Sequence, residues 1–177
     1  MANTFTLIET ISLNSSQSAV VFGNSSSIPQ TYNDLKIVAS VRTDRGATND
    51  YINIYFNTDS NNANYSGSLT YGGGSGTPTS STFSSVSANR YAGDVNGNTS
   101  PTNSFSSTEI YINDYTNGLN KIYHGDTVTT NNASNVVLSF FAGKWTGTSY
   151  INKITFAPGV GSNFLTGTIF SLYGINY

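Results

Sequence analysis

Four charged side chains lie close together in SVRTDRGATNDYINIYFN, residues 40–57. They are Arg42, Asp44, Arg45 and Asp50, in a chain where only 9% of the residues are charged. Such a cluster could be an active site, a binding site or the ion-paired end of a β-hairpin. Arg42 ends one predicted strand, GATN forms a turn and Asp50 begins the next strand, so facing charges would pair and fix the register. The pattern therefore predicts an ion-paired, architectural corner.

The four charged residues are candidates for a rim or a subunit interface, with no catalytic role. Exposed ion pairs contribute only about 0–1 kcal/mol each, so we expect them to provide specificity of assembly more than stability of the fold. Replacement of Arg42 or Asp50 should then impair assembly more than folding.

Residues suited to acid–base or nucleophilic catalysis are few. The only glutamates, Glu9 and Glu109, each lie inside a predicted strand, and nothing indicates that either meets a second acid, as a glycosidase requires. His124 has Asp126 two residues later, but no nucleophile motif such as G-x-S-x-G is present. We expect His124 to be a strand residue at a sheet rim, and we predict no enzyme activity.

The sequence offers little support for a metal site and excludes thiol chemistry. The chain has no cysteine and a single histidine. DVNGN at 94–98 begins like a calcium loop, but its glycine is at the fourth position, and Phe105 stands at position twelve, where a bidentate glutamate is required. We predict no metal site and no cofactor.

The single tryptophan, Trp145, is the last candidate residue. It lies in AGKWTGTSY, between two predicted strands. Together with tyrosines from residues 57–106 it could stack on sugar rings. The favoured alternative is that it caps the core or packs into a subunit interface, where aromatic residues are common anchors.

These residues need a scaffold, and the sequence predicts about ten β-strands. Apolar side chains alternate with polar ones most clearly in 34–43 and 49–57, whereas Gly, Asn or Ser interrupts nearly every window that could be helical. We therefore predict an all-β, antiparallel β-sandwich that is jelly-roll-like and forms a single domain over residues 1–177. The strands are expected at 4–13, 18–23, 34–43, 49–57, 83–93, 108–114, 121–129, 135–143, 150–158 and 168–175.

Two further expectations concern connections. Strands 4–13 and 18–23 are predicted to form a pair through the polar turn NSSQ. Residues 57–106 are predicted to hold long loops, because 70–82 and 93–104 are rich in Gly, Ser, Thr and Asn. Long loops on a rigid β-scaffold commonly make contacts with partners.

Composition excludes several classes of partner. The net charge is −2, and the seven Lys and Arg residues are scattered, so the chain lacks the basic stripe of a nucleic-acid-binding protein. There is no apolar run near the ~18 residues that a membrane span needs. The start, MANTFTLIET, has no basic region followed by an apolar core, so we expect no secretory signal and synthesis in a cytoplasm.

Several segments follow the pattern of one protein family. They are LIETISL (7–13), IPQTYNDLKIVASVRTDR (28–45), YINIYFNTDSNNANYS (51–66), AGKWTGTSYINKITFAPGVGSNFLTG (142–167) and TGTIFSLYGI (166–175). In these segments the chain resembles small β-rich structural proteins of tailed bacteriophages, frequent among marine and cyanobacterial phages. Residues 70–105 match no part of that pattern, and none of the matching motifs is catalytic.

The resemblance implies a non-enzymatic, jelly-roll-like structural protein of a virion, assembled in the host cytoplasm. The leading expectation is a capsid decoration or cement protein on the head surface. It would associate with itself, as a homotrimer or another homo-oligomer, and with the capsid shell protein or other virion proteins. The alternative is a tail or fibre receptor-binding module that binds a host surface glycan.

Overall fold

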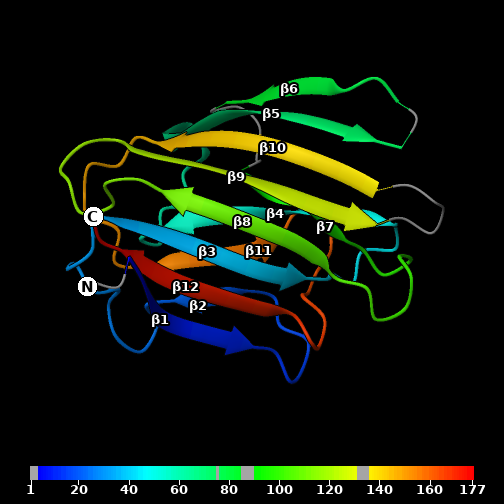
Figure 1. The fold of residues 1–177 in the computed structure, drawn as a ribbon, viewed down its shortest axis with the longest axis horizontal. Coiled ribbons are helices and arrows are strands. Elements are labelled where there is room, and N and C mark those ends of the chain that lie inside the picture. Colours follow the sequence, from blue (N-terminus) through cyan, green and yellow to red (C-terminus); the bar gives the residue numbers. More distant parts are fainter. Residues whose placement is uncertain (1–3, 75, 85–89, 131–135) are drawn as a thin grey trace.

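The chain folds into two antiparallel β-sheets that face each other (Figure 1). This computed structural model describes residues 4–74, 76–84, 90–130 and 136–177. The predicted β-sandwich is confirmed, with twelve strands in place of about ten. The strands are β1 (Phe5–Ser12), β2 (Val20–Phe22), β3 (Asp34–Val41), β4 (Asn49–Phe56), β5 (Tyr65–Gly73), β6 (Thr79–Phe83), β7 (Tyr91–Asn96), β8 (Ser106–Ile112), β9 (Lys121–Thr130), β10 (Val136–Trp145), β11 (Ile154–Pro158) and β12 (Ile169–Ile175).

Eight of these strands form a jelly roll. One sheet contains the order β1-β12-β3-β8, and the other has the order β2-β11-β4-β7. The chain crosses between the sheets at β1 to β2, β2 to β3 and β3 to β4, and the later strands β7, β8, β11 and β12 pair back onto the earlier ones. This interleaving of two four-stranded sheets confirms the jelly-roll-like architecture.

Two inserted hairpins extend one sheet of the jelly roll. The β5–β6 hairpin lies between β4 and β7 in the chain, and the β9–β10 hairpin lies between β8 and β11. Because β9 pairs with β8 and β10 pairs with β5, the hairpins add four strands in the order β9-β10-β5-β6. We call these four strands the extension. Within the described residues, the opposite sheet has no strands beyond β7 to match them.

Two predictions about connections are wrong. β1 and β2 lie in different sheets and do not pair with each other, so NSSQ belongs to a crossover and not to a hairpin turn. Residues 57–106, where long loops were predicted, contain strands β5 and β6, and they also contain β7, which begins inside the predicted strand at 83–93. The predicted strand at 83–93 falls partly on residues 85–89, which lie outside the described residues.

Helical structure is confined, in the described part of the chain, to one 3-10 turn at Asn62–Asn64. No helix there is long and apolar enough to cross a membrane.

The jelly-roll core follows the predicted alternation. In β3, Leu35 and Ile37 are fully buried, whereas Lys36 between them is only half-buried. In β4, Ile52 and Ile54 are also fully buried. Burial of an aliphatic side chain contributes about 1.5–3 kcal/mol, so this alternation holds the two sheets together.

A second part of the core lies between the extension and β4 and β7, and it is mainly aromatic. The ring centroid of Phe56 on β4 lies 5.6 Å from that of Trp145 and 5.7 Å from that of Tyr123. Tyr91 on β7 contacts Phe141 edge-to-face at 5.5 Å. Aromatic pairs at such distances add about 0.5–1.5 kcal/mol beyond burial of their area.

Glycines on the inner face of the extension make room for these rings. A Cβ atom on Gly143 would lie 2.1 Å from Cζ of Tyr123, and one on Gly67 would lie 2.3 Å from Cζ of Phe83. Both contacts are far shorter than atoms permit. The rings of Tyr123 and Phe83 therefore lie directly over the backbone of a neighbouring strand.

We predict that Gly143→Ala destabilises the fold by about 1–3 kcal/mol or more, because the new methyl group overlaps the ring of Tyr123. Urea denaturation measures this change. Gly118→Ala is the matched control: nothing lies within 4 Å of its added Cβ, and we expect a change within about 0.5 kcal/mol. Equal effects of the two substitutions would contradict the packing described here.

Candidate functional site

The charged segment 40–57 joins the two sheets. β3 lies in the eight-stranded sheet and β4 in the four-stranded sheet, so the connection between them is a crossover. The predicted hairpin is therefore wrong, because alternation identifies the two strands but not the sheet that each one joins. We call Arg42, Asp44, Arg45 and Asp50 the polar corner.

Arg42 is buried and binds the backbone of one loop. Its Nη1 donates to the carbonyl oxygens of Pro101 (2.6 Å) and Ser104 (3.0 Å), and its Nη2 donates to those of Asn98 and Ser100, both at 3.0 Å. Only 7% of the residue is exposed. Arg42 therefore holds the 98–104 loop against the end of β3, and it forms no ion pair within the described residues.

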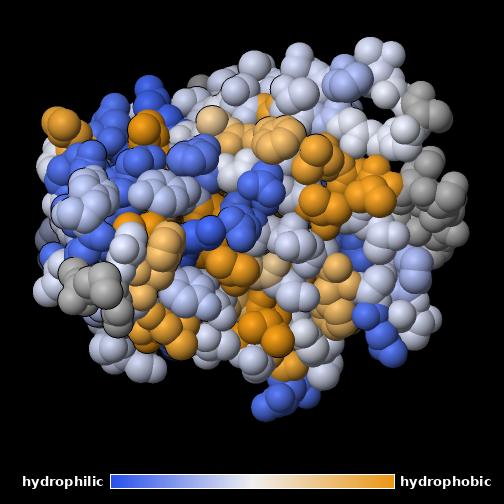
Figure 2. All heavy atoms as spheres, viewed as in Figure 1, coloured by the Kyte–Doolittle hydropathy of each residue, from blue (hydrophilic) through white to orange (hydrophobic). Residues whose placement is uncertain are grey.

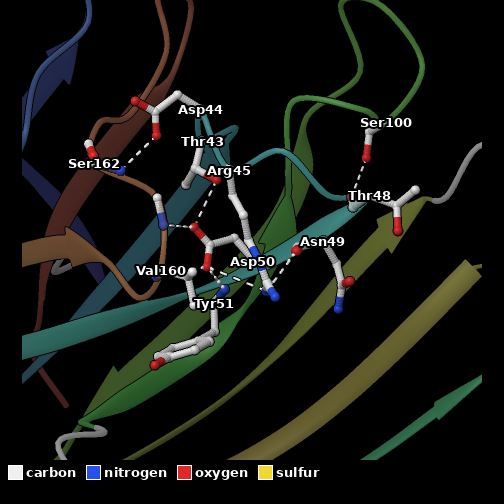
Figure 3. Close-up of polar contacts among 11 residues, drawn as sticks. Thr43, Asp44, Arg45, Thr48, Asn49, Asp50, Tyr51, Ser100, Val160 and Ser162 are labelled. Atoms are coloured by element: carbon white, nitrogen blue, oxygen red, sulfur yellow. Dashed lines mark hydrogen bonds and ion pairs between the residues drawn. The ribbon is translucent and has the colours of Figure 1, made fainter.

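Asp50 is fully buried and binds a second loop (Figure 3). Its carboxylate accepts hydrogen bonds from Thr43 Oγ1 at 2.9 Å and from its neighbour's amide, Tyr51 N, at 2.8 Å. It also accepts from the backbone amides of Val160 at 3.1 Å and Gly161 at 3.0 Å. These bonds tie the start of β4 to the connection between β11 and β12.

Asp44 binds the same connection. Its Oδ1 accepts from the backbone amides of Ser162 (2.7 Å) and Asn163 (3.0 Å), and its Oδ2 accepts from Asn163 Nδ2 at 2.9 Å. Burial acts to raise the pKa of Asp44, but these hydrogen bonds outweigh burial and lower the pKa below its ordinary value.

Arg45 is the half-exposed member of the polar corner. Its Nη1 donates to the carbonyl oxygen of Asn49 at 3.0 Å and lies 3.9 Å from Asp50 Oδ1. This single ion pair replaces the exposed network that was predicted. The polar corner is an internal junction of loops, and the expectation that Arg42 and Asp50 matter more for assembly than for folding does not fit their burial.

Trp145 lies in the core at the end of β10. The sequence favoured two positions for it, the core or a subunit interface, and it occupies the first. It is 3% exposed, and its Nε1 donates to Asp59 Oδ2 at 2.7 Å. Asp59 also accepts from Asn64 Nδ2 at 2.8 Å and from Asn61 N at 2.9 Å. The indole ring of Trp145 is therefore not at the protein surface, and it cannot stack on a glycan in this structure.

The candidate acid–base residues lie apart from one another in the eight-stranded sheet. Glu109 pairs with Lys36 at 2.7 Å, and Glu9 is exposed on β1, with β12 and β3 between their strands. His124 lies on β9 with its ring centroid 5.4 Å from that of Tyr111. Among the residues that the structure describes, no three His, Asp or Glu side chains are grouped as metal ligands would be.

The outer face also carries an apolar surface that the sequence did not single out. Val136, Leu138 and Phe140 occupy alternate positions of β10 and are 52%, 39% and 56% exposed, respectively. Val128 on β9 lies directly opposite Leu138 and is 39% exposed. We call these four residues the outer patch. Figure 2 shows hydrophobic side chains gathered over this part of β9 and β10.

The surroundings of the outer patch are mostly neutral. Phe140 faces Thr70 of β5 on one side and Asp126 of β9 on the other. On β5, the positions that share its face include Ser66 and Ser68. An apolar centre with a polar, hydrogen-bonding surround is the arrangement typical of protein contact surfaces.

Comparison with known proteins gives little further information. No family model matches the chain, and no curated protein matches it. Among solved structures, the galectin LEC-6 of Caenorhabditis elegans is similar over 95% of this chain and 96% of its own, with 9% sequence identity and a TM-score of 0.33. A likeness at this level says nothing about what this chain binds.

We predict that Asp50→Asn destabilises the isolated protein by about 3 kcal/mol or more. Hydrogen bonds to a buried charge contribute about 1.5–3 kcal/mol each, and the NH2 group of the new amide would face the N–H and O–H donors that now bind the carboxylate. Urea denaturation gives the change. Glu9→Gln, at an exposed carboxylate, should have almost no effect. A stable Asp50→Asn protein that fails only in association would restore the sequence-based interpretation.

The bond between Asp59 and Trp145 predicts a pH dependence. Burial acts to raise the pKa of Asp59, but hydrogen bonds from Trp145, Asn64 and Asn61 keep it below its ordinary value of 3.8. Because the folded pKa lies below the unfolded one, the stability that this carboxylate contributes is present above about pH 4 and is lost as pH falls through the folded pKa.

Fluorescence of the only tryptophan reports this titration directly. We expect Trp145 emission in the folded protein to change with a midpoint below pH 3.8, and we expect Asp59→Asn to remove that change. Circular dichroism confirms that each sample remains folded. A midpoint above pH 3.8 would show that burial, and not hydrogen bonding, dominates at Asp59.

Proposed function

We propose that the protein is a non-enzymatic structural component of a bacteriophage virion, and that it associates with copies of itself through the outer patch. The observation that carries the proposal is the row of exposed apolar side chains on β10, with Val128 opposite it. The resemblance of segments at both ends of the chain to phage structural proteins supports the virion context.

The composition of the surface supports association over catalysis. A chain with few charges has little electrostatic repulsion to keep copies apart. Contiguous exposed apolar side chains on a sheet commonly mark contact surfaces. The edge strand β6 supports the proposal too. Among the described strands it pairs with β5 alone, and four of its five residues are exposed. Such an edge offers unpaired backbone groups to a neighbour.

Within this class, we propose a capsid decoration or cement protein that sits on the head in several copies. The partners would be the capsid shell protein and further copies of this chain. Closed symmetry, three-fold in the simplest case, would let each copy bury the outer patch without open-ended growth.

The alternative, a receptor-binding module that uses Trp145, has less support. It requires the indole ring to face a glycan, and this ring is buried against Phe56 and bonded to Asp59. We therefore do not assign Trp145 to a ligand.

We predict that the double substitution Leu138→Ser and Phe140→Ser weakens self-association by at least about tenfold, because burial of the exposed parts of the two side chains in a contact together contributes more than the ~1.4 kcal/mol that a tenfold change requires. Sedimentation equilibrium over a range of protein concentrations measures this. The matched control is Leu119→Ser with Tyr150→Ser, at residues that are 68% and 52% exposed outside β9 and β10.

Two outcomes would contradict self-association through the outer patch. One is a wild-type protein that remains monomeric at all concentrations. The other is an oligomer that both double variants weaken equally. Stoichiometric co-sedimentation of the wild-type protein with empty heads of the phage that encodes it would support the decoration role, and failure to bind those heads would count against that role.

A further inference from the structure

The eight-stranded sheet overhangs its smaller partner, and a groove lies under the overhang. The four-stranded sheet ends at β7, whereas the other sheet continues through β9, β10, β5 and β6. The groove has a volume of about 360 Å³ and is open to solvent. Its lining residues come from β4, β5, β7 and β10: Asn49, Leu69, Tyr71, Gly73, Asp94 and Val137.

Asp94 provides a largely buried carboxyl group to this groove. Its Oδ2 accepts a hydrogen bond from the hydroxyl of Ser139, and the buried hydroxyl of Tyr91 lies beside it. Burial raises the pKa of Asp94 above its ordinary value. Both neighbouring groups are neutral, and within the described residues no cation pairs with this carboxyl.

Asn49 and Tyr71 provide accessible polar and aromatic groups. Asn49 is the first residue of β4, and its side chain points away from Asp50 (Figure 3). The polar corner holds its backbone through Arg45, but its side-chain amide makes no hydrogen bond to the described residues. Tyr71 on β5 is 40% exposed, so its ring remains available for stacking.

The rest of the lining is apolar or small. Leu69 and Val137 provide aliphatic surface, and Gly73 leaves the floor without a side chain. Val137 and Gly73 lie directly opposite each other in the ladder between β10 and β5. Ligand pockets commonly combine such apolar walls with a few polar groups that fix the orientation of the ligand.

We propose that this groove is a binding site for a neutral saccharide. The hydroxyl groups of a sugar would donate to the carboxyl of Asp94, and the amide of Asn49 would both accept from and donate to neighbouring hydroxyls. The apolar face of the sugar ring would pack on Tyr71. The inference is independent of the proposed assembly role, because the groove lies on the inner face of the extension and the outer patch lies on the opposite face.

Other ligand classes fit the groove less well. An anion would be repelled by Asp94, and a metal ion would have one carboxylate where oxygen-coordinated cations in proteins take several ligands. An organic amine could pair with Asp94, but it would leave the amide of Asn49 without a charged or hydroxyl partner of its own. A saccharide uses the carboxyl, the amide and the aromatic ring together.

Nuclear magnetic resonance titration of the full chain tests the proposal. The probes are the neutral sugars glucose, galactose, mannose and N-acetylglucosamine, oligosaccharides built from them, and the amine spermidine. We expect at least one neutral saccharide to shift the backbone amide signals of Asn49, Tyr71 and Asp94. Tyr71→Ala and Asp94→Asn should each weaken that binding by at least about tenfold, as loss of one stacking or charged hydrogen-bonding group does.

Tyr150→Ala is the matched control, because Tyr150 is exposed to a similar degree and is not in the groove lining. It should leave binding unchanged. If Asp94→Asn does not fold, Tyr71→Ala and Asn49→Ala carry the test, since both side chains are exposed. Three results would overturn the proposal: no shift with any neutral saccharide, shifts that these groove variants leave unchanged, or binding of spermidine alone.

Discussion

The pairing of β10 with β5 is the interaction on which the rest of this structure depends. It runs from Val137 opposite Gly73 to Trp145 opposite Tyr65 and joins two hairpins that enter the chain at different points of the jelly roll. Without this ladder the eight-stranded sheet would lose β5 and β6, and only β9 and β10 would remain of the overhang. The groove depends on it, because β5 provides Leu69, Tyr71 and Gly73 to the lining, and the outer patch lies on the opposite face of the same extension.

Two kinds of contact hold the strands and loops of this fold in position. On the inner face of the extension, the rings of Tyr123 and Phe83 lie over Gly143 and Gly67. Because these glycines have no side chain, the rings can pack directly against the backbone. At the end of the jelly roll, the polar corner joins loops from distant parts of the chain through Arg42 and three other charged residues. The first kind of contact is dispersive and the second is made of charge-assisted hydrogen bonds, which are stronger than neutral ones.

The sequence predicts those strands in which apolar and polar residues alternate. β3 and β4 are recognisable because every second residue is apolar, and those residues are buried. β5 is not recognisable, because Gly67 and Gly73 stand where a strand pattern would place apolar residues, and the rings that fill the space come from other strands. The sheet that each strand joins is also not encoded locally, which is why a hairpin was predicted between β3 and β4.

The candidate sites were hidden for a related reason. From the sequence alone, Asp50 and Arg42 resemble exposed charges. In the fold they are hydrogen-bonded to the loops at 158–163 and 98–104, which are distant in the chain. The groove collects Asn49, Tyr71 and Asp94 from three separate segments with no shared motif. The sequence does show that Val136, Leu138 and Phe140 form an apolar row on one face of β10. The alternation does not tell whether that face packs in the core or is exposed to solvent.

Because the chain has no cysteine, a single introduced cysteine can carry a spin label and report contacts between copies. A label at Thr70→Cys, beside Phe140 on the outer face, should give a short label-to-label distance at concentrations where the protein associates. A label at Thr155→Cys, on β11 of the opposite sheet, should not. Short distances from Thr155→Cys alone would place the contact on the other side of the sandwich and contradict the central claim that copies meet through the extension.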